Sequence, residues 1–148
     1  MAAPRIVLRH SALALALALA ASLPPAPAGA AGSAVPQMLE RYRQQGGGPF
    51  DPARGERLWH REVMGPKGKP RSCTTCHGQD LRRPGKHQRT GKRIEPMDPR
   101  VNPERFTQAK KIKKWLRRNC KWTWGRECTP QEKGDLLLFL DPRVKEGS

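Results

Sequence analysis

The segment Cys73-Thr74-Thr75-Cys76-His77 constrains this chain more than any other part of its sequence. Its two cysteines are one helical turn apart, and the next residue adds an imidazole on the same side. This C-x-x-C-H spacing is typical of covalent haem attachment, in which two thiols add to vinyl groups along one porphyrin edge and the histidine binds the iron. The motif predicts one covalent haem c, attached through Cys73 and Cys76, with His77 as an axial ligand.

The first 30 residues have the pattern of a secretory signal peptide. Basic residues precede a small and apolar run from Ala12 to Leu23, and a small-x-small site follows at residues 28–30. The run is shorter than the ~18–20 apolar residues that cross a bilayer, which disfavours an uncleaved membrane anchor. We therefore expect cleavage near Ala30 and export to the periplasm, with no membrane-spanning segment in the mature chain.

In an oxidising compartment, cysteines outside the motif are expected to pair. The remaining two, Cys120 and Cys128, are therefore predicted to form a disulfide with each other. A zinc site built from all four cysteines is disfavoured, because seven residues separate the second pair where zinc motifs have about two to four. A thioredoxin-like redox pair would need a preceding strand and a βα framework, and the sequence indicates neither.

Four helices are expected, and no strand. They cover residues 35–45, 51–63, 102–119 and 129–140. Asp51, Asn102 and Thr129 each precede a proline and are predicted N-caps. The helix that carries Leu58 and Trp59 is expected to cross the last helix beside the haem. The stretch from 78 to 102 has almost no periodicity and needs something to wrap around, such as a haem edge.

Residues 31–148 contain little material for a hydrophobic core. Aromatic residues make up 5% of the whole chain and charged residues 28%. A chain of this size buries one modest core, and a haem would add a large apolar surface to it. We expect a short N-terminal helix and Gly-rich linker over 31–50, followed by a cytochrome domain over 51–148, with an all-α fold.

The group in the sixth coordination position of the iron decides what such a haem can do. Met97 lies in a Pro-bounded segment like the methionine loops of small cytochromes, but it follows His77 by only 20 residues. His60 and His87 lie among basic residues, where solvated side chains are expected. The local pattern alone predicts that Asn119 is a helix C-cap.

Four blocks of the sequence together resemble the sphaeroides haem protein (SHP) family. They are Cys73-Thr74-Thr75-Cys76-His77-Gly78, Arg89-Thr90-Gly91-Lys92, Lys114-Trp115-Leu116-Arg117-Arg118-Asn119-Cys120 and Gly125-Arg126-Glu127-Cys128-Thr129-Pro130. The resemblance extends from about residue 51 to residue 140, nearly the whole mature chain. It implies a small class I cytochrome c-type fold with covalently bound haem.

The resemblance also implies the ligand set. The ferric haem would have His77 on one side and the Asn119 side chain on the other, next to a Cys120–Cys128 disulfide. On reduction the asparagine would leave, and oxygen, nitric oxide or carbon monoxide could bind. A neutral carboxamide oxygen is a hard, weak ligand that suits ferric iron better than ferrous iron. Met97 would then line the distal pocket or compete for the iron.

The formal net charge of +16 raises the question of partners. Nucleic acid is the usual expectation for such a balance, but an exported protein meets little of it. An acidic redox partner or an anionic membrane surface fits better. The resemblance implies a dihaem c-type cytochrome as the electron-donating partner. Six cations on the helix that bears Asn119 are the predicted docking residues: Lys110, Lys111, Lys113, Lys114, Arg117 and Arg118.

Together these inferences predict an electron carrier whose reduced haem binds diatomic gases. One alternative is an enzyme that acts on a diatomic gas or a peroxide. It would need an acid or base positioned over the iron, for which His87 is the obvious candidate. The other alternative is a plain six-coordinate carrier that uses Met97.

Overall fold

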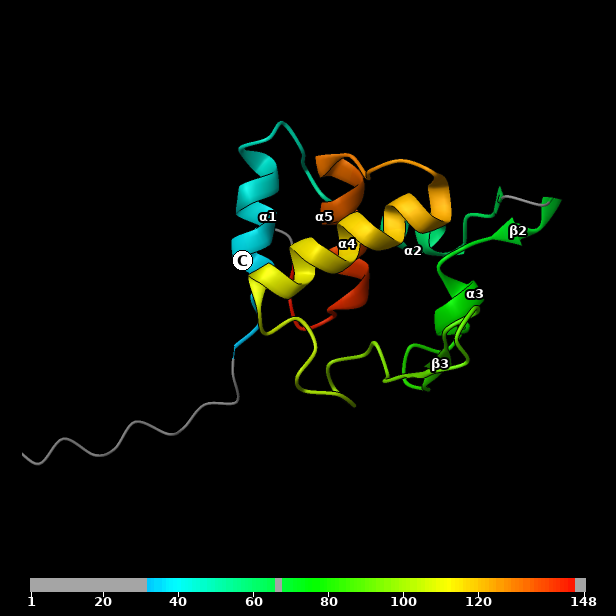
Figure 1. The fold of residues 1–148 in the computed structure, drawn as a ribbon. Coiled ribbons are helices and arrows are strands. Elements are labelled where there is room, and N and C mark those ends of the chain that lie inside the picture. Colours follow the sequence, from blue (N-terminus) through cyan, green and yellow to red (C-terminus); the bar gives the residue numbers. More distant parts are fainter. Residues whose placement is uncertain (1–31, 66–67, 146–148) are drawn as a thin grey trace, which may run out of the picture.

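The computed structural model describes residues 32–65 and 68–145, and this part of the chain is mainly helical (Figure 1). Its helices are α1 (Val35–Arg43), α2 (Pro52–His60), α3 (Thr74–His77), α4 (Ala109–Trp124) and α5 (Pro130–Leu140). None of the helices in these ranges is long and apolar enough to span a membrane. The predicted signal peptide over residues 1–30 lies outside the described residues.

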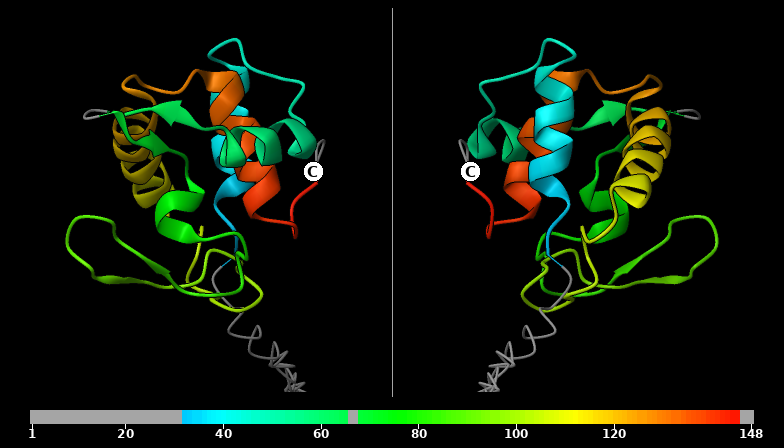
Figure 2. Two further views of the ribbon diagram at one scale, coloured as in Figure 1. Left: turned by 90° about the vertical axis from the view of Figure 1, so that its right-hand side faces the viewer. Right: turned by 90° about the vertical axis from the view of Figure 1, so that its left-hand side faces the viewer.

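Two short antiparallel hairpins are present where the sequence predicted no strand. β1 (Val63–Met64) pairs with β2 (Pro70–Arg71), and β3 (Gly85–Lys86) pairs with β4 (Arg93–Ile94). The first hairpin takes up the end of the helix predicted over 51–63, so α2 ends at His60. The second hairpin lies within the stretch expected to be structureless and projects from the body of the molecule (Figure 2).

The starts of α2 and α5 follow from local hydrogen bonds, and the sequence prediction of both is confirmed. The Asp51 side chain accepts a hydrogen bond of 2.9 Å from the Ala53 amide at the start of α2. At the start of α5, Thr129 and Glu132 form a reciprocal capping box. Such caps pair amide groups that the first turn of a helix otherwise leaves without partners.

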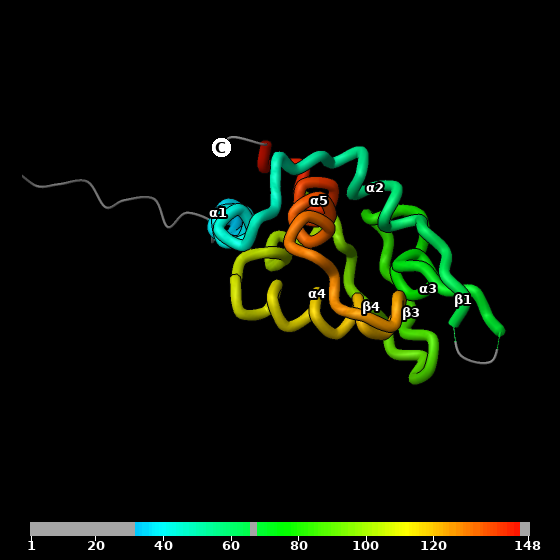
Figure 3. Tube along the Cα trace, turned by 90° about the horizontal axis from the view of Figure 1, so that it is seen from above, coloured from blue at the N-terminus to red at the C-terminus, as the bar shows by residue number. Residues whose placement is uncertain are grey.

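α2 and α5 make the most extensive helix–helix contact of the described chain, as the sequence predicted. They approach closely because Gly55 lies against the Asp135 backbone, where a Cβ atom would overlap the carbonyl oxygen. Figure 3 shows α1 and α2 on opposite sides of α5, with α4 running across the same helices. One buried cluster joins α1, α4 and α5, and a second joins α2, the end of α4 and α5.

The start of α4 differs from the sequence prediction. Asn102 caps no helix, because its side-chain amide donates to the Pro96 carbonyl and the chain turns instead. Phe106 has a φ of 61°, a left-handed conformation that is rare for a residue with a side chain. Its carbonyl accepts a 2.7 Å hydrogen bond from Ala34, and its ring packs against both clusters. This long-range anchoring delays the helix until Ala109.

The end of α4 also differs. The helix continues past Asn119 to Trp124, and Gly125 ends it in a left-handed conformation with a φ of 71°. The interpretation of Asn119 as a C-cap is therefore wrong, because this residue lies inside the helix. Its side chain is accordingly available for another role.

The buried carboxylate of Asp135 ties the α2 end of the molecule to α5. Its side chain is 2% exposed, and it accepts hydrogen bonds from the Asp51 amide at 2.7 Å and from Arg54 Nε at 3.0 Å. Gln131 adds a third donor at 3.0 Å. A buried charge is tolerated when it is this fully paired.

We predict that Asp135→Ala lowers the free energy of unfolding by about 3–5 kcal/mol, because it leaves these donors without their acceptor. Urea unfolding of the haem-loaded protein, followed by circular dichroism, measures this value. Asp80→Ala serves as control, since Asp80 is 54% exposed and pairs only with solvent-facing neighbours. Its effect should stay below about 1 kcal/mol. Equal losses in the two variants would contradict the assigned role of Asp135.

Candidate haem site

The cysteine motif folds as the single turn α3. Ser72 opens the turn, with its amide donating to Thr75 Oγ1 at 2.9 Å. Gly78 ends it with a φ of 75° and a ψ of −179°, a conformation essentially restricted to glycine. One turn places Cys73, Cys76 and His77 on the same side of the helix. The local sequence therefore presents two thiols and an imidazole together.

The β3–β4 hairpin holds this turn in place. Gly85 lies against α3 so closely that a Cβ atom would overlap the Cys76 carbonyl oxygen and crowd the His77 Cα. Gln88 donates a hydrogen bond of 3.1 Å to the Thr75 carbonyl. The segment that looked irregular in the sequence is thus a support for the motif.

The cysteine chemistry argues against a zinc or a dithiol redox site. Burial, followed by the neighbouring Cys76, raises the pKa of the Cys73 thiol to about 12, whereas the reactive thiol of a dithiol redox site has a lowered pKa. Cys120 and Cys128 are joined in a disulfide with their Cα atoms 5.6 Å apart. No group of three or more His, Cys, Asp or Glu side chains in the described ranges could hold a metal ion.

The His77 imidazole lies in an apolar setting. Its ring centroid is 5.1 Å from that of Trp59, a buried residue of the cluster that includes Leu136 and Leu140. Burial, with a smaller effect of the Arg105 charge, lowers the pKa of His77 to about 4. The neutral imidazole is the form that binds metals.

The polar atoms around the motif fit a haem. Across the described residues, three buried side-chain nitrogens have no hydrogen-bond partner: His77 Nδ1, Trp59 Nε1 and Trp124 Nε1. Native proteins leave few such groups unpaired, and all three lie in or against the apolar cluster that contains Cys73. A prosthetic group with a broad apolar surface and acceptor oxygens suits this setting.

One face of α4 fits the other side of such a group. Helical spacing places Asn119 on the same side as Ile112, Leu116 and Thr123, which are buried or partly buried. Asn119 itself is nevertheless exposed, and so are Trp115 at 48% and Trp122 at 40%, which lie four residues before it and three residues after it. This side of α4 faces the interior along most of its length but is exposed at Asn119. A large planar ligand could lie against it there.

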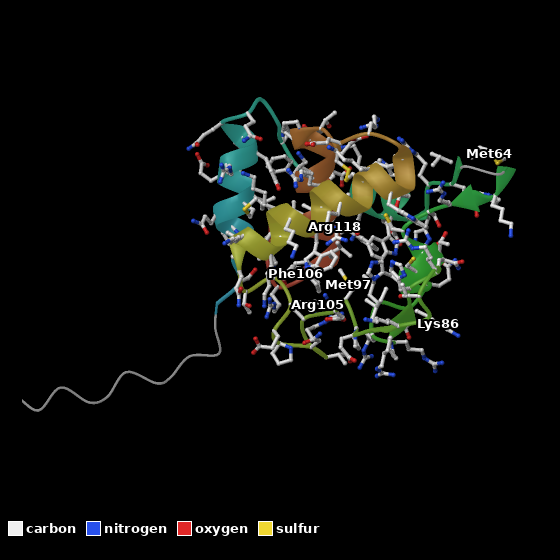
Figure 4. The ribbon with its side chains drawn as sticks, viewed as in Figure 1. Met64, Lys86, Met97, Arg105, Phe106 and Arg118 are labelled. Carbon is white, nitrogen blue, oxygen red and sulfur yellow. A yellow bond between two sulfur atoms is a disulfide. The ribbon has the colours of Figure 1, made fainter. Side chains whose placement is uncertain are left out.

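Met97 lies below α4 together with Arg105 and Phe106, as Figure 4 shows. It packs against the same cluster as Cys73, and its amide donates to the Leu81 carbonyl at 2.9 Å. Arg105 donates to the Pro96 carbonyl at 2.8 Å and also to the Glu95 carbonyl. These bonds fix the loop that carries Met97 next to the motif.

His87, the predicted candidate for an acid or base over the iron, belongs to the β3–β4 hairpin. It lies in the β3–β4 turn, where its Nδ1 is 3.0 Å from the Thr90 hydroxyl and accepts from the Thr90 amide at 3.2 Å. The ring thus serves the turn of the hairpin.

Two arginines and one glutamate surround the Trp124 ring at the end of α4. The Arg61 guanidinium lies 4.7 Å from the Trp124 ring centroid on α2's side, and that of Arg126 lies 5.7 Å away. Both cations share the carboxylate of Glu132, which Arg126 contacts at 2.6 Å and Arg61 at 4.0 Å. These contacts connect the disulfide loop, which contains Trp124 and Arg126, to Arg61 after α2 and to Glu132 of α5. The sequence analysis missed them, since no spacing pattern links these residues.

Four of the six predicted docking residues divide into two sets with different neighbours. Lys114 and Arg118 lie over the exposed Trp115 ring, at 5.5 and 5.1 Å from its centroid. Lys113 and Arg117 instead line a cavity that also involves α1 and α5. The helical period of 100° per residue could have separated these two sets in the sequence.

Several known proteins are similar to this chain in sequence. A family model described as a domain of unknown function (DUF1924) matches residues 45–140. The cytochrome c-type protein SHP of Cereibacter sphaeroides is 45% identical over 114 residues, which cover 77% of this chain and 88% of that protein. This chain belongs to the SHP family. Cytochrome c'' of Methylophilus methylotrophus is 35% identical over 91 residues, or 62% of this chain and 63% of that protein.

Solved structures agree with this membership of the SHP family. Oxidized SHP, described as an oxygen binding cytochrome c, superposes with a TM-score of 0.67 at 43% identity, covering 74% of this chain and 97% of that chain. A solution structure of cytochrome c'', concerned with haem-ligand detachment, superposes with a TM-score of 0.61 at 28% identity, covering 72% and 90%. The protein is therefore a c-type cytochrome with covalently bound haem c, as the motif predicted.

In this SHP-family cytochrome, the Glu132 carboxylate should contribute stability that depends on pH. The hydrogen bond from Arg126 is the main cause of a pKa lowered from the usual 4.5. A carboxyl whose pKa is lower in the folded state stabilises the fold above its unfolded pKa, and this contribution is lost as the pH falls through the folded value.

We predict that Glu132→Gln lowers the free energy of unfolding by about 1–2 kcal/mol at pH 7. The difference from wild type should shrink as the pH falls below about 4.5, since the wild-type carboxyl then loses its charge. Chemical unfolding at several pH values measures both effects. Glu104→Gln, in an exposed turn, is the control and should differ from wild type by less than about 0.5 kcal/mol throughout. A difference that stays constant down to pH 3 would refute the electrostatic explanation.

Proposed function

We propose that this protein is an exported monohaem cytochrome of the class I type that transfers electrons, and that Asn119 is its second, weak axial ligand. Release of Asn119 on reduction lets oxygen, nitric oxide or carbon monoxide reach the haem. Export through a cleaved signal peptide to the periplasm is part of the proposal. Gas binding by the reduced haem and ligand release are supported by membership in a family that includes an oxygen binding cytochrome c and by the relation to cytochrome c''.

The haem iron supplies one-electron chemistry and a sixth coordination position. His77 provides the firm ligand on one side, because its partly buried ring packs against Trp59 and its turn is held by Gly85. The chain's task on the other side is to hold a neutral donor near the iron without fixing it strongly. A carboxamide oxygen meets this requirement, since softer ferrous iron binds it less well than ferric iron.

The single observation that carries the proposal is the position of Asn119. It lies on the inward line of α4 and yet is exposed, between Trp115 and Trp122. No hydrogen bond within the described chain holds its side chain in α4, where Asn has no capping role. An asparagine in the middle of a helix lowers helix propensity, so its presence at this point favours a role toward the haem.

The disulfide next to Asn119 supports the same role. Cys120 is 4% exposed and is joined to Cys128, which directly precedes the N-cap of α5. The bond ties the last turns of α4 to the start of α5. Asn119 can therefore swing through its own side-chain torsions while the helix backbone stays in place.

We predict that Asn119→Ala changes the ferric absorption spectrum and leaves carbon monoxide binding by the reduced protein intact. The reason is that the substitution removes the donor from the oxidised state, while the reduced state has already released it. Spectra of both proteins in both oxidation states, with and without carbon monoxide, provide the measurement. A wild-type ferrous haem that stays six-coordinate and ignores carbon monoxide would sink the proposal.

Met97 supports a second candidate, a plain His/Met electron carrier, because it packs in the cluster that contains Cys73. Met97→Leu separates the two functions and is a matched control for Asn119→Ala. If Asn119 is the ligand, Met97→Leu leaves the ferric spectrum unchanged. If Met97 is the ligand, the far-red thioether band of the wild type disappears in Met97→Leu and persists in Asn119→Ala.

Lys114 and Arg118 are the docking residues that fit electron transfer best. They flank the exposed Trp115 one turn from Asn119, so a bound partner would lie near the haem. The proposed partner is an acidic redox protein, a dihaem c-type cytochrome as donor. Complementary charge speeds the encounter of such partners without requiring strong binding.

We predict that electron transfer from an acidic dihaem c-type cytochrome slows steeply between low and high salt, because the Debye length shrinks to about 10 Å at 0.1 M. Lys114→Gln/Arg118→Gln should slow the second-order rate at low salt more than Lys113→Gln/Arg117→Gln, which removes equal charge from the α1 side. Stopped-flow absorbance measures these rates. Equal slowing by both pairs would contradict docking at Trp115.

A further inference from the structure

A concave site lies between α1, α4 and α5 and shares no residue with the cluster around Cys73. Its volume is about 130 Å³. Charged side chains dominate its lining: Arg41, Lys113, Arg117, Lys133 and Glu127. Neither haem binding nor the proposed docking at Trp115 accounts for this cavity.

Three separate helices bring the four cations together. Arg41 comes from α1, Lys113 and Arg117 from α4, and Lys133 from α5. Lys113 and Arg117 are four residues apart on one helix, where like charges repel and destabilise it. Arg41 of α1 and Lys133 of α5 add further positive charge to this pair. A bound anion would therefore reduce the repulsion and stabilise the arrangement.

The single acid in the lining does not neutralise the site. Glu127 pairs with Lys121 at 3.1 Å, and that bond, with the more distant charges of Lys133 and Arg117, holds the pKa of Glu127 below its usual range. Glu127 is therefore ionised but directed to a cation outside the cavity. In the described part of the chain, no carboxylate lies within 4.0 Å of the cations that line the cavity.

Tyr42 adds a neutral donor to the lining. Its side chain is buried, and the Lys133 ammonium lies 5.8 Å from its ring centroid. Burial raises the pKa of Tyr42 to about 12, so its hydroxyl keeps its proton at neutral pH. A lining that combines guanidinium and ammonium groups with a tyrosine offers only donors of these kinds, and such a set suits an oxyanion.

We propose that this cavity binds a small free oxyanion of the inorganic phosphate class. The cavity far exceeds the ~10–15 Å³ needed by one water and is well below the ~300 Å³ of sites for drug-sized ligands. A phosphate-sized anion fits between these limits and accepts several charge-assisted hydrogen bonds at once. Such an anion would clamp α1 to α4 and α5. The inference rests on a different set of residues from the haem proposal.

Calorimetric titration of the mature haem-loaded protein with inorganic phosphate, at ionic strength held constant with chloride, tests the site. We expect saturable binding of one phosphate. Lys113→Gln/Arg117→Gln should weaken it at least about tenfold, because two charge-assisted hydrogen bonds are lost. Lys114→Gln/Arg118→Gln removes the same charge from the neighbouring face of α4, over Trp115, and should weaken it less than about threefold. Circular dichroism and the haem spectrum check that each variant is folded.

Glu127→Gln provides a second variant that removes no cation. It should tighten phosphate binding at least about twofold, because it removes the one negative charge at the cavity. Absence of saturable binding, equal weakening by the two double variants, or unchanged affinity in Glu127→Gln would each overturn the proposal. Binding to phosphatidic acid vesicles without binding to free phosphate would likewise overturn it, since the head group would then be the ligand.

Discussion

The one-turn helix α3 is the constraint on which the rest of the structure depends. Two thiols and an imidazole must face one side, and a single turn has too few hydrogen bonds to persist alone. Ser72 and Gly78 therefore set its two ends, and Gly85 lets the β3–β4 hairpin lie directly on its backbone. The turn would hold the haem through Cys73, Cys76 and His77, so the bonds that fix the turn would also fix the place where the haem attaches.

Helix α4 would supply the opposite side of the proposed site, and it carries much of the charge. Its inward line carries Asn119, its last turns carry the disulfide, and its two outer sides carry separate sets of cations. One helix can serve these roles because successive side chains are rotated by 100° and so point in different directions within a single turn. Lys114 and Arg118 thus face Trp115, while Lys113 and Arg117 face α1.

The parts that the sequence predicted are those decided locally. The N-cap at Asp51 and the capping box at Thr129 depend on side chains within three residues, so the predicted starts of α2 and α5 are confirmed. Asn102 carries the same local signal, but the distant contact of Phe106 with Ala34 turns the chain there instead. The two-residue strands have no period to detect, and the motif alone revealed the haem.

In the proposed function, the positive charge of α4 and the neutrality of Asn119 act in the same direction. An added electron is stabilised by nearby cations, and a ligand without charge does nothing to oppose it. Because Arg118 and Asn119 are adjacent on one helix, the residue that would meet an acidic donor lies next to the residue that would leave the iron. Electron arrival and ligand release would then occur in one place, and no long-range conformational change is needed to connect them.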